Sequence, residues 1–231
     1  MITMTCEGLS SIPYFDGLKF RGCPLCRMIN DLERKTIKDI LYELTLEYSV
    51  RIKFINSQGL CPYHAWLLLD IAKETGEKLG ASMIYESVLK AYVDKIDKVI
   101  EGDETKCFIC ENVRGFEKYY IEIFSNCINQ RGLQDYEKSE GIFCVKHFNS
   151  LINSPNFKLR KEFLKIQKDK LNSLHKKLKS YIDKHDYRNE DPITEDEESA
   201  IDLTIEALKG YKTSLSFNTI IPEKRRKFSL K

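Results

Sequence analysis

The chain has 231 residues, of which 42% are apolar and 31% charged, and its formal net charge is +2. The length allows one large domain or two small ones, and the composition is ordinary for a globular protein. The charge gives no general reason to expect nucleic acid or an acidic membrane as partner. Because no long apolar run occurs and residues 1–5 do not resemble a secretory signal, we expect no membrane association and a cytoplasmic location.

The first predicted element is a pair of cysteines, Cys23 and Cys26, followed by a long amphipathic helix. The helix is predicted because apolar residues recur at steps of three and four: Ile29, Leu32, Ile37, Ile40, Leu41 and Leu44. A looped or strand-like return then leads to Cys61-Pro-Tyr-His64, where Pro62 suits the first turn of a helix. Trp66 on that helix is expected to pack in the core over a metal site, and a further helix is predicted for residues 79–100.

The second half of the chain begins after a predicted hinge at residues 102–105. Cys107-Phe-Ile-Cys110 opens another amphipathic helix, whose apolar residues are Val113, Phe116, Tyr120, Ile121, Phe124 and Ile128. Cys144-Val-Lys-His147 begins a short helix that ends before Pro155. No segment shows the alternation of a strand beside a hairpin turn, so almost no sheet is expected.

A long helix with a lysine-rich face is predicted after Pro155, and a solvated face is favoured over a binding surface. The helix breaks at residues 184–192, and Thr194 to Glu197 form a capping box for the last helix. That helix should bury its apolar side chains, namely Ala200, Ile201, Leu203, Thr204, Ala207 and Leu208, and end at Gly210. Residues 224–227 form a basic tail.

The cysteine and histidine pairs form an internal repeat. Cys107 lies 84 residues after Cys23, Cys144 lies 83 residues after Cys61, and a glycine precedes each CxxH pair. Phe143 is an insertion relative to the first copy. We therefore predict an all-α protein built by duplication of one helical metal-binding unit. The expected segments are a first unit at 1–102, a second unit at 103–154, C-terminal helices at 155–213 and a flexible basic tail at 214–231.

The repeat supplies two sets of three thiols and one imidazole, the ligands of a closed tetrahedral zinc site. The predicted metal ligands are Cys23, Cys26, Cys61, His64, Cys107, Cys110, Cys144 and His147. Helix N-termini at these positions favour the thiolate form. Pairing within each copy is favoured over pairing between copies. Two zinc ions are expected, with an iron–sulfur cluster as the main alternative and thiol–disulfide chemistry as the third.

Two further groups of residues lie outside the predicted metal sites. Cys6 and Cys127 lie outside the repeat and are expected to be an ordinary thiol and a buried, inert thiol. His185, Asp186, Tyr187 and Arg188 form a possible polar site, with His185 as general base and Arg188 as anion clamp. A structural corner is favoured there, in which Tyr187 docks into the core and Asp186 caps a helix end. We assign no catalytic residue.

The combination of motifs resembles an uncharacterised prokaryotic family, catalogued as a domain of unknown function. That family has duplicated CPxC and GxCxxH units followed by a C-terminal helix and a KHDYR segment. The matching stretches here are 23–26, 59–64, 107–110, 141–147 and 184–188, within residues 20–210. Phe108 departs from the pattern because the first copy has proline there. The resemblance implies that the segment from His185 to Arg188 matters, and it implies no activity.

The sequence thus predicts a zinc-binding helical protein in which each structural site contributes on the order of 10 kcal/mol to folding. We expect an adaptor or interaction module with a protein partner rather than an enzyme. One alternative is an iron–sulfur protein for electron transfer or redox sensing. Another is a nucleic-acid-binding protein that uses the lysine-rich helix and the basic tail, whose affinity would fall steeply with salt.

Overall fold

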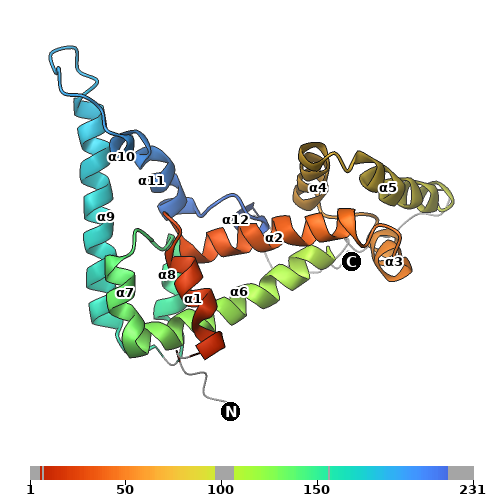
Figure 1. Ribbon diagram of the computed structural model, residues 1–231, viewed down its shortest axis with the longest axis horizontal. Coiled ribbons are helices and arrows are strands. Elements are labelled where there is room, and N and C mark those ends of the chain that lie inside the picture. Colours follow the sequence, from red (N-terminus) through yellow and green to blue (C-terminus); the bar gives the residue numbers. More distant parts are fainter. Residues whose placement is uncertain (1–5, 7, 97–106, 156, 218–231) are drawn as a thin grey trace, which may run out of the picture. The chain divides into compact units, whose positions relative to one another are not determined.

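The computed structural model describes residues 6, 8–96, 107–155 and 157–217, and this part of the chain is helical without a β-strand (Figure 1). An isolated parallel bridge joins Gly22 and Gly141. The backbone N–H of Ile142 donates to the carbonyl oxygen of Gly22 at 2.8 Å. The prediction of an all-α fold with almost no sheet is confirmed.

The helical elements follow one another in this order: η1 (Gly8–Ser11), α1 (Ile12–Leu18), α2 (Pro24–Tyr42), α3 (Tyr48–Asn56), α4 (Pro62–Thr75), α5 (Lys78–Val93), α6 (Phe108–Cys127), the π-helical η2 (Ile128–Gly132), α7 (Leu133–Lys138), α8 (Val145–Ile152), α9 (Arg160–Asp183), α10 (Glu195–Glu198), α11 (Ala200–Lys209) and α12 (Ser214–Phe217). None of the helices described is long and apolar enough to cross a membrane.

Each copy of the repeat opens with a long helix, α2 in the first and α6 in the second. The predicted apolar positions include buried side chains in both helices, such as Ile37 and Ile40 in α2 and Val113 and Phe124 in α6. Each helix starts directly after the first cysteine of a CxxC pair. The amphipathic period and the position of the cysteines therefore predicted both helices correctly.

The chain divides into two compact units. Unit 1 comprises residues 1–31 and 115–211, and unit 2 comprises residues 32–114 and 212–231. The boundaries fall inside α2 and inside α6, so each of these helices contributes residues to both units. This division follows contacts in space, whereas the predicted segments 1–102, 103–154, 155–213 and 214–231 follow the repeat along the chain.

Unit 1 has an aromatic core. Tyr136, Phe143 and Phe163 are buried, and their ring centroids lie 5.0 to 5.6 Å apart. Tyr14 and Phe124 belong to the same apolar cluster, as do three cysteines of the repeat: Cys23, Cys26 and Cys144. These cysteines are therefore surrounded by apolar side chains rather than by water.

The C-terminal helices of unit 1 follow the prediction in most respects. The side chain of Thr194 and that of Glu197 form the predicted capping box, and Gly210 ends α11 with a positive φ of 88°. Leu203 packs in a small buried cluster with Ile142, Leu174, Ala200 and Ala207. The expected burial of Ile201 and Leu208 is wrong, because each follows a buried alanine by one residue, about 100° around the helix, and its side chain is exposed.

Unit 2 contains α3, α4 and α5, with α5 packed against both of the others. The looped or strand-like return predicted before Cys61 is wrong, since residues 48–56 form α3 and bury Phe54. From Tyr48 to Phe54 its aromatic and β-branched residues alternate with polar ones, but tertiary packing decides the structure of such short segments. The expected burial of Trp66 is also wrong: it is 66% exposed, because a position two residues before the buried Leu68 lies about 200° away around the helix.

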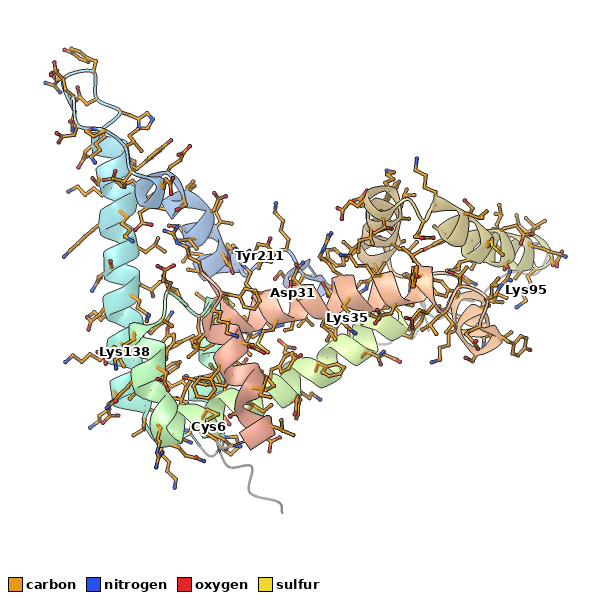
Figure 2. The ribbon with its side chains drawn as sticks, in the orientation of Figure 1. Cys6, Asp31, Lys35, Lys95, Lys138 and Tyr211 are labelled. Atoms are coloured by element: carbon orange, nitrogen blue, oxygen red, sulfur yellow. A yellow bond between two sulfur atoms is a disulfide. The ribbon has the colours of Figure 1, made fainter. Side chains whose placement is uncertain are left out.

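The structure corrects the prediction for the two cysteines outside the repeat. Cys6, labelled in Figure 2, forms a disulfide with Cys127 at the end of α6. The two residues are 121 positions apart in the chain, so sequence proximity gave no indication of this bond. The predicted hinge at 102–105 and the basic tail at 224–227 lie outside the described residues.

Candidate metal centres

The eight cysteine and histidine residues of the repeat gather in two clusters, each able to hold a metal ion. Cluster A consists of Cys23, Cys26, Cys144 and His147, and cluster B consists of Cys61, His64, Cys107 and Cys110. The expectation of pairing within each copy is wrong. The CxxC pair of one copy meets the CxxH pair of the other copy, so neither copy holds a complete ligand set.

All four ligand pairs are built in the same way at the start of a helix. The first ligand directly precedes the helix, and the second lies three residues later in its first turn, as with Cys61 and His64 in α4 and with Cys144 and His147 in α8. At α2 and α6 the carbonyl oxygens of Cys23 and Cys107 accept the N–H of the residue four positions later. This spacing turns both ligand atoms toward one point beside the positive end of the helix dipole.

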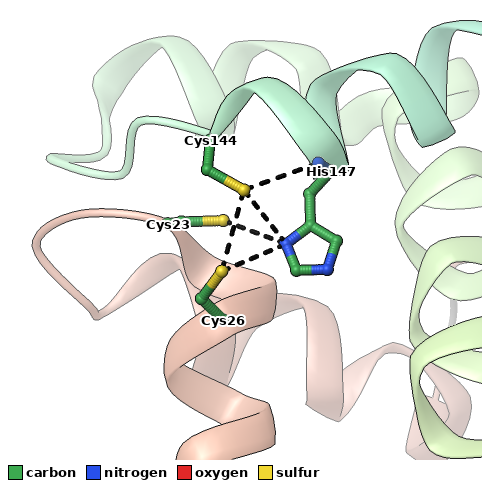
Figure 3. Close-up of side chains that lie close together, drawn as sticks. All are labelled: Cys23, Cys26, Cys144 and His147. Atoms are coloured by element: carbon green, nitrogen blue, oxygen red, sulfur yellow. Dashed lines mark hydrogen bonds between the residues drawn. The ribbon is translucent and has the colours of Figure 1, made fainter. Parts of the chain in front are cut away.

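Cluster A brings three sulfur atoms together around the Nδ1 atom of the His147 ring (Figure 3). The Nδ1 atom of His147 lies 3.4 Å from the Sγ of Cys23, 3.3 Å from that of Cys26 and 3.4 Å from that of Cys144. The Sγ atoms of Cys26 and Cys144 are 3.7 Å apart.

Cluster B has nearly the same dimensions. The Nδ1 atom of His64 lies 3.3 Å from the Sγ of Cys61 and 3.4 Å from those of Cys107 and Cys110. The Sγ atoms of Cys61 and Cys110 are 3.6 Å apart. Two clusters assembled from different parts of the chain therefore converge on one arrangement.

These dimensions match a tetrahedral metal site. With metal bonds of about 2.3 Å to sulfur and about 2.0 Å to nitrogen, sulfur atoms lie about 3.8 Å apart and sulfur and nitrogen about 3.5 Å apart. The observed sulfur separations of 3.6 and 3.7 Å are close to these values. They are far longer than a disulfide bond of about 2.05 Å, and none of the six cysteines of the clusters belongs to a disulfide.

Cluster A is closed to solvent, and three of the four ligands of cluster B are buried. In cluster A every ligand side chain is buried, with an exposure of 2% or less. In cluster B His64, Cys107 and Cys110 are buried, and Cys61 is partly exposed. Burial on this scale suits a site whose ligands all come from the protein.

The buried groups of each cluster compete for protons. Hydrogen bonds from the Cys23 and Cys26 thiols hold the pKa of Cys144 well below its usual range. Burial, together with hydrogen bonds to Cys144 and Cys26, holds the pKa of Cys23 well above its usual range. In cluster B hydrogen bonds from Cys110 and Cys61 lower the pKa of Cys107. One thiolate is thus stabilised at the expense of its neighbours, and a divalent cation at the centre would allow all three sulfurs to ionise.

Sequence reasoning missed two glutamates that contact the histidines. The Oε1 atom of Glu117 lies 3.1 Å from Nε2 of His147, and the Oε1 atom of Glu33 lies 3.4 Å from Nε2 of His64. Each glutamate follows a CxxC pair by seven residues, and Glu117 lies 84 residues after Glu33, as Cys107 does after Cys23. A comparison of the copies beyond their cysteines and histidines could have found this signal.

A third buried glutamate supports the backbone of cluster A. Glu206 in α11 accepts the N–H of Cys23 at 2.8 Å and pairs with the Arg27 guanidinium at 2.7 Å, and Arg27 also stacks on the ring of Tyr211. Gly22 has a positive φ of 108°, and a Cβ atom there would lie 2.6 Å from the Glu206 carboxylate oxygens. Only glycine suits this position, and nothing in the sequence pattern pointed to Glu206.

Replacement of Glu206 tests this support. Glu206→Ala should lower the free energy of unfolding by about 2–3 kcal/mol, because the N–H of Cys23 and the guanidinium of Arg27 both lose a charged acceptor. Urea titration followed by circular dichroism measures the change. Asp202→Ala, an exposed position on the same helix, is the control and should stay within about 0.5 kcal/mol of the wild type. Equal effects of the two substitutions would contradict the assignment.

The segment from His185 to Arg188 lies in the turn after α9 and is organised by local contacts. The Asp186 carboxylate accepts from the backbone N–H of Arg188 at 3.0 Å and from its guanidinium at 2.6 and 2.9 Å, and Nδ1 of His185 lies 2.8 Å from the carbonyl oxygen of Tyr181. Tyr187 is 92% exposed, so its predicted docking into the core is wrong. None of the contacts described for these four residues involves cluster A or cluster B.

The lysine-rich helix α9 combines solvated and bonded side chains. Lys161, Lys165 and Lys168 are exposed. In contrast, Lys170 donates to the carbonyl oxygen of Ser139, and Lys177 pairs with Asp196 at 2.5 Å. The preference for a solvated face over a binding surface stays a prediction.

Comparison with known proteins gives a family but no activity. The profile of a family described as "Family of unknown function (DUF6062)" matches residues 5–104 and again residues 90–214. The chain is also similar to a protein from Caldicellulosiruptor sp. (strain Rt8B.4), described as "Uncharacterized 23.9 kDa protein in xynA 3'region". The identity is 27% over 204 residues, which cover 84% of this chain and 98% of that protein. No solved structure matches. Two overlapping matches to one profile fit the duplicated helical unit, and the chain belongs to the DUF6062 family of unknown function.

Proposed function

We propose that the chain binds two zinc ions in structural Cys3His sites and acts as an adaptor for a partner protein. The observation that carries the proposal is the geometry of the clusters. In each, three Sγ atoms and one Nδ1 atom surround a single point at the spacing of a zinc tetrahedron, and all eight ligands lie at helix starts.

The spacing favours one metal ion in each cluster over an iron–sulfur cluster. The four ligand atoms of each cluster lie within 4.8 Å of one another. In an iron–sulfur cluster the protein ligands bind different iron atoms, which bridging sulfides hold apart, so the ligand atoms need a wider separation. Zinc also suits the mixture of three thiolates and one imidazole.

The burial of the clusters favours a structural role for the metal over a catalytic one. A catalytic zinc keeps a coordination position for water or substrate, whereas four protein ligands fill the tetrahedron. Cluster A is closed by the aromatic core of unit 1, where Phe143 and Tyr136 are buried beside its cysteines. A metal in such a site stabilises the fold, and the exposed surface is left for recognition.

The surface of unit 2 supports the adaptor role. Trp66, Leu79 and Leu89 on α4 and α5 are 63–74% exposed. Exposed apolar side chains can mark a protein interaction site, and tryptophan is enriched among the residues that carry the binding energy of such sites. We also propose a cytoplasmic location, since a reducing compartment keeps the six cysteines of the clusters as thiols for metal binding; the Cys6–Cys127 disulfide would be reduced in the same compartment.

Metal analysis tests the proposal. Protein purified without oxygen should contain about two zinc ions per chain and show no visible colour. Replacement of zinc by cobalt should produce the absorption bands of tetrahedral cobalt with thiolate ligands. Iron together with acid-labile sulfide would contradict the zinc proposal and support a redox protein. For the adaptor role, Trp66→Ala should reduce recovery of a partner from the native host while it retains both zinc ions. Equal recovery would contradict a role for this surface.

A further inference from the structure

The repeat contains a carboxylate as well as the metal ligands. Glu33 and Glu117 occupy the same place in the two copies, seven residues after the second cysteine of the CxxC pair. The helix of each glutamate begins at the cysteines of one cluster, and the glutamate contacts the histidine of the other cluster. Glu33 in α2 lies beside His64 of cluster B, and Glu117 in α6 lies beside His147 of cluster A.

In cluster A the histidine has its two ring nitrogens in different surroundings. Nδ1 of His147 faces the three sulfur atoms, and Nε2 lies 3.1 Å from Oε1 of Glu117. The Glu117 side chain is 14% exposed and is also paired with Lys146 at 2.9 Å. The acceptor therefore sits on the side of the ring opposite to the proposed metal.

In cluster B the carboxylate is fully buried. Oε1 of Glu33 lies 3.4 Å from Nε2 of His64 and accepts the backbone N–H of Ser214 at 3.0 Å and the hydroxyl of the same serine. Oε2 accepts the hydroxyl of Tyr63 at 3.2 Å. Among the described residues, His64 is the group that forms an ion pair with Glu33. Every other contact supplies a proton donor, which holds the carboxylate in place as an acceptor.

We propose that Glu33 and Glu117 are positioning residues that orient the two metal-binding histidines. Glu117 accepts the Nε2–H of His147, whereas Oε1 of Glu33 lies 3.4 Å from Nε2 of His64 without forming a hydrogen bond in this structure and needs only a small shift to accept that proton. In both rings Nδ1 is then left without a proton and directed at the metal. A carboxylate on the far nitrogen fixes the tautomer and ring orientation and makes the ligating nitrogen more basic. This inference rests on the proposed metal binding and adds a fifth residue to each site.

The occurrence of the same contact twice argues against an incidental salt bridge. The surroundings of the two carboxylates differ, since Glu117 has a lysine partner and Glu33 has hydroxyl and backbone donors. What the two share is the repeat position and the contact with Nε2 of a histidine. If the two glutamates only stabilised the fold, there would be no reason for both of them to contact a metal-binding histidine.

Isosteric substitution tests the role without removing bulk. Glu33→Gln and Glu117→Gln should each weaken zinc binding by about 10- to 100-fold at one site, measured by competition with a chromophoric chelator. The matched controls are Asp31→Asn in α2 and Glu122→Gln in α6, both exposed, and these should retain wild-type affinity. In cadmium-loaded protein, each glutamate variant should move one of two cadmium NMR signals, and the two variants should move different signals.

A measurement on the unmodified protein covers the case in which a variant fails to fold. Long-range proton–nitrogen NMR of the zinc-loaded chain should show two histidine rings with a proton on Nε2 and metal on Nδ1. Metal on Nε2, or wild-type zinc affinity in both folded glutamine variants, would overturn the role of the glutamates while zinc binding stands. A wild-type chain that binds no metal would instead overturn the proposed function.

Discussion

Removal of both metal ions is expected to abolish the folded state of the protein. A structural zinc site contributes on the order of 10 kcal/mol, and the net stability of a domain is about 5–15 kcal/mol. Both clusters lie at helix starts, and cluster A lies inside the aromatic core of unit 1, so loss of the ion leaves buried thiols and an imidazole without a partner. The free energy lost with both ions therefore exceeds the net free energy of unfolding of the protein.

The experiment compares the chain before and after treatment with a strong chelator in denaturant, followed by removal of the denaturant. We expect loss of the cooperative thermal transition and of dispersion in the proton NMR spectrum, because the helices depend on tertiary packing. Zinc should restore both signals, whereas magnesium, which prefers oxygen ligands, should restore neither. A metal-free chain that melts cooperatively near the wild-type temperature would show that the clusters are not structural sites.

The second large effect is the loss of zinc from pairs of cysteine variants, which reports the crossed pairing of the repeat. Cys23→Ser with Cys144→Ser removes two ligands from cluster A alone, so about one zinc ion per chain should remain. Cys23→Ser with Cys61→Ser removes one ligand from each cluster, so both sites should be weakened. Pairing within each copy would give the opposite result. Metal content after dialysis against a competing chelator measures the difference.

The control for these variants uses the two cysteines outside the clusters. Cys6→Ser with Cys127→Ser removes the disulfide and should leave about two zinc ions per chain, because neither residue belongs to a cluster. Loss of zinc in this variant would mean that cysteine substitution affects metal content through the stability of unit 1. The zinc content of the Cys23/Cys144 and Cys23/Cys61 variants would then be compared with that of the disulfide variant instead of the wild type.

The sequence by itself determined the features that depend on neighbouring residues. Two ligands separated by two residues turn toward one point when the first precedes a helix and the second lies in its first turn, so the CxxC and CxxH spacings predicted both the helix starts and the ligand pairs. The apolar period predicted α2 and α6. The three-residue spacing of Thr194 and Glu197, typical of a capping box, predicted the start of α10.

The tertiary structure alone decided which of these local features meet. Cys26 and Cys144 are 118 residues apart, and Cys61 and Cys110 are 49 residues apart, and no local rule selects such partners over those within a copy. The same holds for the disulfide of Cys6. The exposure of Trp66 and Tyr187 was likewise decided by packing, because an aromatic side chain is buried only where another element covers it.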